Sequence, residues 1–165
     1  MLAIFRGACY AFVLLFLCII LRIVVDFALN MATRCRVPIM VICSGSMQPA
    51  LYRGDVVFFA NFSQPKVSDI VAFEAAGHGP LIAHRVARIV ALQSPSGSVP
   101  GFITRGDANM EDDHSLYRNG RALYKSDIIG KCYAVIPMLG YVSLFLTAQP
   151  VLSVVISVAV VYCII

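Results

Sequence analysis

The stretch VPIMVICSGSMQP, residues 37–49, runs from an apolar segment into a sequence that suits neither a helix nor a strand. Val37 to Cys43 is apolar and predicts a buried strand. Ser44 to Pro49 combines serine, glycine and proline, which predicts a tight, exposed turn. Because such a turn holds a side chain out of the packed core, Ser46 is a candidate nucleophile.

The composition predicts one domain with membrane anchors. Hydrophobic residues make up 59% of the 165 residues and charged residues only 13%, which is far from an ordinary soluble domain. The net charge of +4 forms no basic stripe, so nucleic acid is not an expected partner. The six cysteines contain no CxxC pair, which disfavours a structural zinc site and a disulfide framework, although one disulfide stays open.

The N-terminal segment predicts a retained membrane anchor. Gly7 to Leu21 carries no charge, and the apolar character continues to about Leu29, which reaches the roughly 20 residues that a bilayer needs. A cleavable signal peptide is the alternative, but a small-x-small cleavage site is not found at the right place. Arg6 precedes the segment while Arg34 and Arg36 follow it, so the orientation is weakly specified.

The C-terminal tail is a second apolar segment. Val151 to Ile165 is continuous and apolar, but it is shorter than the roughly 20 residues of a full span. Pro150 suits the first turn of a helix, so we expect a short apolar helix associated with the membrane. A full crossing would need residues back to about Leu144, with a kink at Pro150.

Between these anchors the hydrophobic pattern changes from continuous to alternating. Short runs rich in Val, Ile and Phe are separated by turn sequences, and the Ser/Pro/Gly-rich residues 94–101 predict an exposed loop. This pattern predicts a mainly β, antiparallel domain over residues 31–141, between an anchor at 1–30 and an apolar segment at 142–165. The runs are Val56–Ala60, Asp69–Glu74, Ile82–Leu92, Phe102–Thr104 and Ile128–Ile136.

Three polar elements stand out in this apolar background: Ser46, His84, and the acidic residues within 105–113. A serine hydroxyl needs a base to become a nucleophile near neutral pH, and a neutral imidazole is suited to that role. A carboxylate then fixes the tautomer of the imidazole and stabilises the imidazolium. The spacing alone is not specific, because most small proteins contain these residues.

The order of several short motifs resembles that of the type I signal peptidases, over roughly residues 37–141. The motifs are SGSMxP at 44–49, RGD at 53–55, HRV at 84–86, GD at 106–107, DD at 112–113 and IIGK at 128–131, with Pro137 and Gly140-Tyr141. His84 stands where bacterial members carry a lysine. The His84-Arg85 pair is similar to the catalytic subunits of the eukaryotic endoplasmic-reticulum signal peptidase complex.

The resemblance implies a role for each polar residue. Ser46 is the expected nucleophile and His84 the expected general base. Asp113 aligns with the third triad member and Asp107 with a supporting or alternative acid, and the sequence does not decide which of them contacts His84. The resemblance also implies an oxyanion hole from the Ser46 backbone N–H and the Ser44 hydroxyl. No cofactor or metal is indicated.

The implied activity is that of a membrane-bound serine endopeptidase that removes signal peptides from nascent secretory and membrane proteins. The resemblance implies a single-pass protein of the endoplasmic-reticulum membrane, with a lumenal catalytic domain and substrates that carry small side chains before the cut. Its implied partners are preproteins, other subunits of the complex, the translocon and membrane lipid. Asn61-Phe62-Ser63 is a glycosylation sequon that is usable only on the lumenal side.

Two alternatives and two departures from the family pattern remain. The chain has Gln48 where the family usually carries glutamate, and Ala108 where it often carries asparagine. One alternative is a catalytically inactive structural subunit. The other is a Ser–Lys protease that uses Lys66 or Lys125, while His114 is a rival for the base.

The remaining charged residues have simpler expected roles. Arg85 is expected to pair with an acid, and Asp112 to be solvated. Asp55, in the Arg53-Gly54-Asp55 turn, is expected to support the fold.

Overall fold

The computed structural model describes residues 2–94 and 97–148, so the predicted apolar tail at 151–165 lies outside the described residues. The chain divides into two compact units. Of the described residues, one unit holds the N-terminal helix as far as Leu29 and residues 142–148, and the other holds Asn30–Tyr141. The second unit carries every residue of the predicted site.

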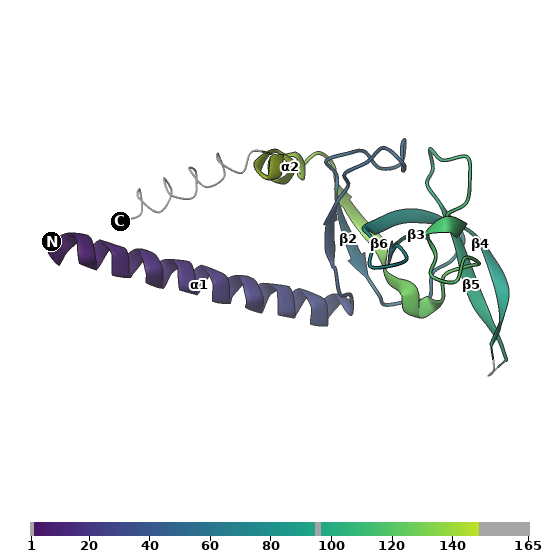
Figure 1. The fold of residues 1–165 in the computed structure, drawn as a ribbon, viewed down its shortest axis with the longest axis horizontal. Helices are drawn as coiled ribbons and strands as arrows, with labels where there is room; N and C mark the ends of the chain where they lie inside the picture. The colour runs from purple at the N-terminus through teal and green to yellow at the C-terminus, as the bar shows by residue number, and fades with distance from the viewer. Residues whose placement is uncertain (1, 95–96, 149–165) are drawn as a thin grey trace. The chain divides into compact units, whose positions relative to one another are not determined.

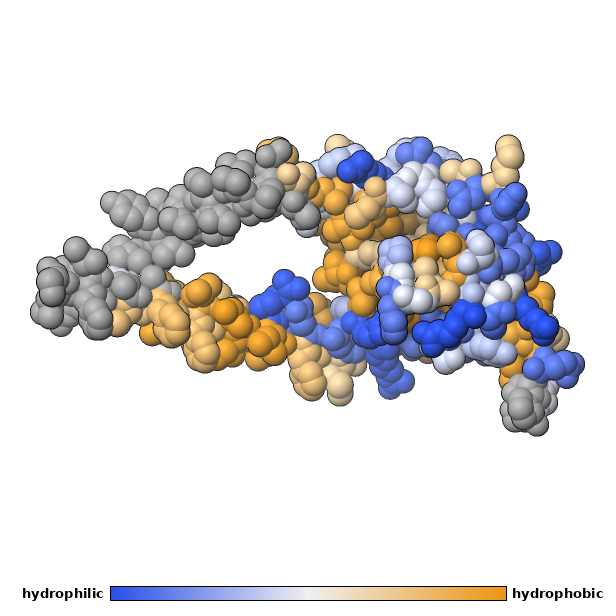
Figure 2. Space-filling model, viewed as in Figure 1, coloured by the Kyte–Doolittle hydropathy of each residue, from blue (hydrophilic) through white to orange (hydrophobic). Residues whose placement is uncertain are grey.

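The N-terminal helix α1 covers Leu2–Thr33. Its segment Phe12–Thr33 is 22 residues long and apolar enough to cross a membrane, and Figure 2 shows hydrophobic side chains along it. The only ion pair described within this segment joins Arg22 Nε and Asp26 Oδ2 at 2.7 Å, one turn apart, which lowers the cost of both charges in an apolar helix. The helix ends before Arg34, whose φ of 52° is left-handed.

The second unit contains one antiparallel sheet, with the spatial order β1-β2-β6-β3-β4-β5 in the described residues (Figure 1). Its strands are β1 (Ile39–Val41), β2 (Val56–Ala60), β3 (Ile70–Glu74), β4 (Leu81–Ser94), β5 (Gly97–Arg105) and β6 (Ile128–Ile136). The other elements are two 3₁₀ turns, η1 (His114–Leu116) and η2 (Lys125–Asp127), and a short helix α2 (Tyr141–Ala148). The predicted fold class is confirmed.

Both faces of the sheet are packed. Val71, Ala72 and Phe73 are adjacent on β3, and all three are fully buried. Because successive strand residues point to opposite faces, both faces of the sheet are covered at this strand. Ala72 belongs to one core cluster, with Cys35, Ile42, Met47, Leu51, Val57, Phe59 and Ala83. Val71 and Phe73 belong to the other, with Val86, Phe102, Tyr117, Leu123 and Ile128. The first cluster anchors the turn that carries Ser46, and the second anchors the segment that follows β5.

The predicted loop at 94–101 is wrong for residues 97–101. They form the first half of β5 and pair with β4, as in Gln93 with Ser98 and Ala91 with Pro100. Proline lacks an N–H, which makes it unfavourable in a central strand. Because β5 is the outermost strand of the sheet, Pro100 is tolerated there. The Ser/Pro/Gly composition of these residues therefore predicted a loop where the structure has an edge strand.

Asp55 ties three segments of the domain together, as expected. Its side chain is buried, and its two carboxylate oxygens accept hydrogen bonds from the backbone N–H groups of Tyr52, at 2.8 Å, and Met138, at 3.1 Å. The backbone carbonyl of Asp55 accepts from the N–H of Ile42 at 2.9 Å. Asp55 thus connects the end of the β1 segment to the turn before α2.

Candidate active site

Ser46 lies in the turn after β1, and its neighbours hold the turn against the core. The side chains of Met47 and Leu51 are each only 1% exposed. The Leu51 N–H donates to the Met47 carbonyl at 2.9 Å, and the Gln48 N–H donates to the Gly45 carbonyl at 3.1 Å. Ser46 itself is half-buried. The packing of Met47 therefore places the preceding hydroxyl at the edge of the core, where a substrate can reach it.

His84 is supplied by β4 and is buried. It lies opposite Val71 in the register of β3 and β4, and its ring meets the edge of the Phe73 ring at a centroid distance of 6.5 Å. His84 Nε2 lies 3.0 Å from Ser46 Oγ. The serine is therefore within hydrogen-bonding distance of a base that is separated from it by 38 residues of sequence.

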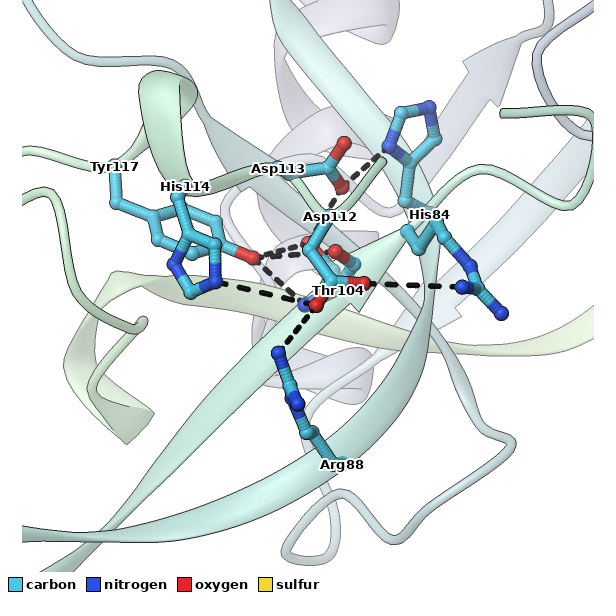
Figure 3. A network of polar contacts seen from close by, with 8 residues as sticks. His84, Arg88, Thr104, Asp112, Asp113, His114 and Tyr117 are labelled. Carbon is cyan, nitrogen blue, oxygen red and sulfur yellow. Dashed lines mark hydrogen bonds and ion pairs between the residues drawn. The ribbon is translucent and has the colours of Figure 1, made fainter. Parts of the chain in front are cut away.

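Asp113 is the acid that contacts His84. Its Oδ2 lies 2.6 Å from His84 Nδ1, and both side chains are buried (Figure 3). A carboxylate on Nδ1 favours the tautomer that carries its proton there, which leaves the Nε2 lone pair facing Ser46. The structure thus brings Ser46, His84 and Asp113 into one line of contacts.

Asp107 has a different partner. It forms a bidentate pair with Arg85 at 2.8 and 2.7 Å, and this contact raises the pKa of Arg85. Arg85 also donates to the Ser68 carbonyl at 2.8 Å. The next residue, Ala108, donates its N–H to the Ser46 carbonyl at 2.9 Å. Asp107 therefore fixes the loop that holds the backbone of Ser46.

Asp112, the acidic residue beside Asp113, is partly exposed and forms a surface ion pair. Asp112 Oδ2 lies 2.6 Å from Arg88 Nη2 (Figure 3). His114, the rival base, turns its Nδ1 to the Arg121 carbonyl at 2.9 Å. Among the described contacts, none joins Asp112 or His114 to Ser46.

The lysines of the Ser–Lys alternative also have other surroundings. Lys125 Nζ donates to Asn61 Oδ1 and, at 3.4 Å, to the Ser63 carbonyl. Burial lowers the pKa of Lys125, but among the described contacts none joins this amine to Ser46. The Lys66 backbone N–H donates to Asp69 Oδ2 at 2.7 Å, and no described contact joins the Lys66 amine to Ser46. The contacts therefore favour His84 as the base.

A pocket of about 560 Å³ opens beside the serine. Its walls come from residues 40–44 and 80–84, and Ser46 and His84 line it. Ser44 Oγ, another lining group, lies 3.2 Å from Ser46 Oγ. Among the described residues that line this pocket there is no carboxylate, lysine or arginine. The pocket is suited to an uncharged segment of chain in front of the Ser46 hydroxyl.

Sequence reasoning missed Thr104 and Tyr117, which lie behind Asp113. Thr104 is fully buried on β5 and donates its hydroxyl to Asp113 Oδ2 at 2.8 Å. Tyr117 Oη lies 3.0 Å from Thr104 Oγ1. Nothing in the local sequence marks these residues, because only the pairing of β4 with β5 places Thr104 near His84.

Comparison with known proteins identifies relatives named as catalytic subunits of the signal peptidase complex. The protein from Neurospora crassa is 38% identical over 117 residues, which cover 68% of this chain and 66% of that protein. The human protein is 36% identical over 116 residues, covering 68% and 59%. The Clavispora lusitaniae protein is 40% identical over 124 residues, covering 73% and 72%. The match thus spans 59–66% of the first two relatives, and no family model matches the chain.

Proposed function

The chain belongs to the family of signal peptidase complex catalytic subunits, and from this premise we propose that it is a membrane-bound serine endopeptidase that cleaves N-terminal signal peptides. Its substrates are nascent secretory and membrane proteins. The observation that carries the proposal is the line of contacts from Ser46 through His84 to Asp113. Nucleophile, base and orienting acid are the parts that acyl transfer by a serine needs.

In the first half of the reaction, Ser46 Oγ attacks the carbonyl carbon before the scissile bond. His84 Nε2, at 3.0 Å, takes the hydroxyl proton, and Asp113 stabilises the imidazolium through Nδ1. The oxyanion that forms needs preorganised donors. The Ser46 N–H and the Ser44 hydroxyl are the proposed donors, and the 3.2 Å distance between the two serine hydroxyl oxygens supports this role for Ser44.

In the second half, His84 returns the proton to the leaving amine. The amine departs as the new N-terminus of the mature protein, and the signal peptide stays on Ser46 as an ester. His84 is then neutral and takes a proton from a water that attacks this ester. The ester bond to Ser46 then breaks as His84 gives this proton to Ser46 Oγ, which restores the hydroxyl and releases the signal peptide as a carboxylic acid.

The same contacts weigh against an inactive structural subunit. A subunit without catalysis has no need of a histidine held in one tautomer against a half-buried serine hydroxyl. We further propose that the chain works in the endoplasmic-reticulum membrane as a single-pass protein with its β domain in the lumen. Other complex subunits, the translocon and membrane lipid are its proposed partners. An apolar helix that precedes the site keeps it near emerging signal peptides.

The lining of the pocket predicts a strong preference for uncharged residues just before the cut. A preprotein with alanine at that position should be cleaved by membranes that contain this chain. Replacement of that alanine by arginine should slow cleavage by about 100-fold or more, because the pocket supplies no partner for a buried charge. The measurement is the ratio of mature protein to preprotein over time.

A matched control places the same arginine several residues into the mature part of the preprotein, where cleavage should stay within about twofold. Equal cleavage of the alanine and arginine preproteins would contradict the assignment of this pocket to the substrate.

Gly106 gives a test of the backbone around the nucleophile. A Cβ at this residue would lie 2.6 Å from the Ser46 carbonyl oxygen and 2.8 Å from Asn109 Nδ2, so the Gly106→Ala backbone must shift. Because misplacement of a reacting group by about 1 Å costs up to about 100-fold, we expect kcat to fall by about ten- to 100-fold. The measurement is kcat per folded enzyme.

Gly120→Ala is the control for general destabilisation. Gly120 has a φ of 64° and open space around it, so alanine strains the backbone without approaching Ser46. Its kcat should stay within about twofold of the unchanged chain. If Gly106→Ala behaves in the same way, the loop does not position the nucleophile.

A further inference from the structure

We propose that Thr104 and Tyr117 are positioning residues that hold the Asp113 carboxylate in its contact with His84. The line of hydrogen bonds then extends from Ser46 through His84, Asp113 and Thr104 to the buried hydroxyl of Tyr117. The proposal rests on the proposed function of Ser46 and His84. It concerns residues that touch neither the substrate pocket nor the reacting atoms and act only through Asp113.

The sheet register explains why Thr104 reaches this place. Thr104 on β5 pairs with Val86 on β4, two residues along from His84. Residues two apart in a strand share a face, so Thr104 lies diagonally across from His84 on one face of the sheet. Asp113 then joins the two: its backbone N–H donates to the Thr104 carbonyl at 3.0 Å.

One carboxylate oxygen receives both donors. Asp113 Oδ2 lies 2.6 Å from His84 Nδ1 and 2.8 Å from Thr104 Oγ1, as Figure 3 shows. The two contacts fix the direction of this oxygen, because turning the carboxylate would break both. Asp113 is only 4% exposed and Thr104 is fully buried, so water is a poor replacement for the lost donor.

Tyr117 completes the arrangement by holding Thr104. The Thr104 N–H donates to Tyr117 Oη at 2.7 Å, and Tyr117 Oη lies 3.0 Å from Thr104 Oγ1. Since the threonine proton is directed at Asp113, the tyrosine O–H is the donor of this pair, and it has two acceptors on Thr104: Oγ1 at 3.0 Å and the backbone carbonyl at 3.3 Å. Burial raises the pKa of Tyr117, which keeps its hydroxyl protonated as a donor. Hydrogen bonds aligned in one direction strengthen one another.

The ring of Tyr117 is also fixed by packing. It meets the ring of Phe73 at a centroid distance of 6.0 Å and that of His114 at 5.8 Å. The Phe73 ring also meets the ring of His84, so one buried aromatic side chain packs against both His84 and Tyr117. The substitution Tyr117→Phe therefore removes only the hydroxyl and should leave the packing of the ring in place.

The decisive experiment compares Thr104→Val with Thr104→Ser in membranes that contain the full chain. Valine keeps the shape and removes the donor, while serine keeps the donor. We expect Thr104→Val to lower kcat by about ten- to 100-fold with KM within about twofold, and Thr104→Ser to stay within about threefold. In Tyr117→Phe, kcat should fall by about threefold to tenfold, whereas in Tyr133→Phe, at an exposed position of β6, kcat should not change.

The pH profile separates positioning from general destabilisation. A buried carboxylate that has lost a donor holds its charge less well, so the acid limb of kcat for Thr104→Val should move to higher pH and that for Thr104→Ser should not. The charged and titratable groups around Asp113 are His84, Tyr117 and Asp112. Asp112 in turn forms ion pairs with Arg88, Arg105 and His114. Neither substitution touches the contacts of Asp112 with Arg88, Arg105 and His114, so a moved limb points to a change between Thr104 and the Asp113–His84 contact.

Two results would overturn the inference. One is a Thr104→Val enzyme with an unchanged kcat. The other is a loss of kcat that only follows a loss of folded protein, with an unmoved acid limb. A parallel Ser46→Ala sample keeps the two proposals apart: if it still cleaves, the proposed function fails, whereas cleavage lost in Ser46→Ala but kept in Thr104→Val removes only the role of Thr104.

Discussion

Ser46→Ala will abolish cleavage of a model presecretory protein by membranes in which this chain is the only signal peptidase catalytic subunit. The substitution removes the atom that forms the ester, and the expected loss is on the order of 10⁴-fold or more. The fold should survive, because Ser46 is only half-buried and His84 keeps its 2.6 Å contact with Asp113. The assay follows appearance of the mature protein, with assembly of the variant checked separately.

Two serine controls refine this result. Ser98→Ala removes an exposed hydroxyl near the start of β5 and leaves the Asn61-Phe62-Ser63 sequon intact, so cleavage should be unchanged. Ser44→Ala removes the proposed side-chain donor of the oxyanion hole, and a loss of about 10²- to 10³-fold is expected. If Ser46→Ala cleaves as well as the unchanged chain, the nucleophile is elsewhere and a structural role becomes the better interpretation.

Asp113→Asn will cost about 10⁴-fold in kcat, far more than the same change at either neighbouring acid. An asparagine amide can donate to His84 Nδ1, and the ring then carries its proton on Nε2, facing Ser46. A ring in that tautomer cannot accept the serine proton. KM should change little, because Asp113 does not line the substrate pocket.

The other two acids provide matched controls for this prediction. Asp112→Asn loosens a surface pair with Arg88 and should change kcat by no more than about threefold. Asp107→Asn weakens the bidentate ion pair with Arg85 and so loosens the loop that holds the Ser46 backbone. We expect kcat to fall by about tenfold, an intermediate loss. A larger loss at Asp107 or Asp112 than at Asp113 would reverse the assignment of the acid.

Much of the fold follows from local patterns. Alternating apolar residues located the strands at Val56–Ala60 and Ile128–Ile136, with bounds that the structure confirms. The long uncharged segment similarly indicated α1. The failure at residues 97–101 has a physical cause: Ser, Gly and Pro are typical of loops, yet an edge strand accepts them because one side of it has no partner.

The candidate site divides in the same way. The residue types of the turn at Ser46 and the order of the motifs indicated the nucleophile and the base. The choice between Asp107 and Asp113 was open in the sequence, because both acids lie in one short loop. The structure turns Asp107 to Arg85 and Asp113 to His84.

The sequence by itself determined the mainly β domain, the apolar N-terminal helix and the set of polar residues from which a site can be made. Only the tertiary structure decided which of them meet, because His84 lies 38 residues from Ser46 and 29 from Asp113 along the chain. Strand periodicity and turn propensity act over a few residues. The pairing of β4 with β3 and β5 is a long-range choice, and it is this pairing that directs His84 to Asp113 and places Thr104 behind them.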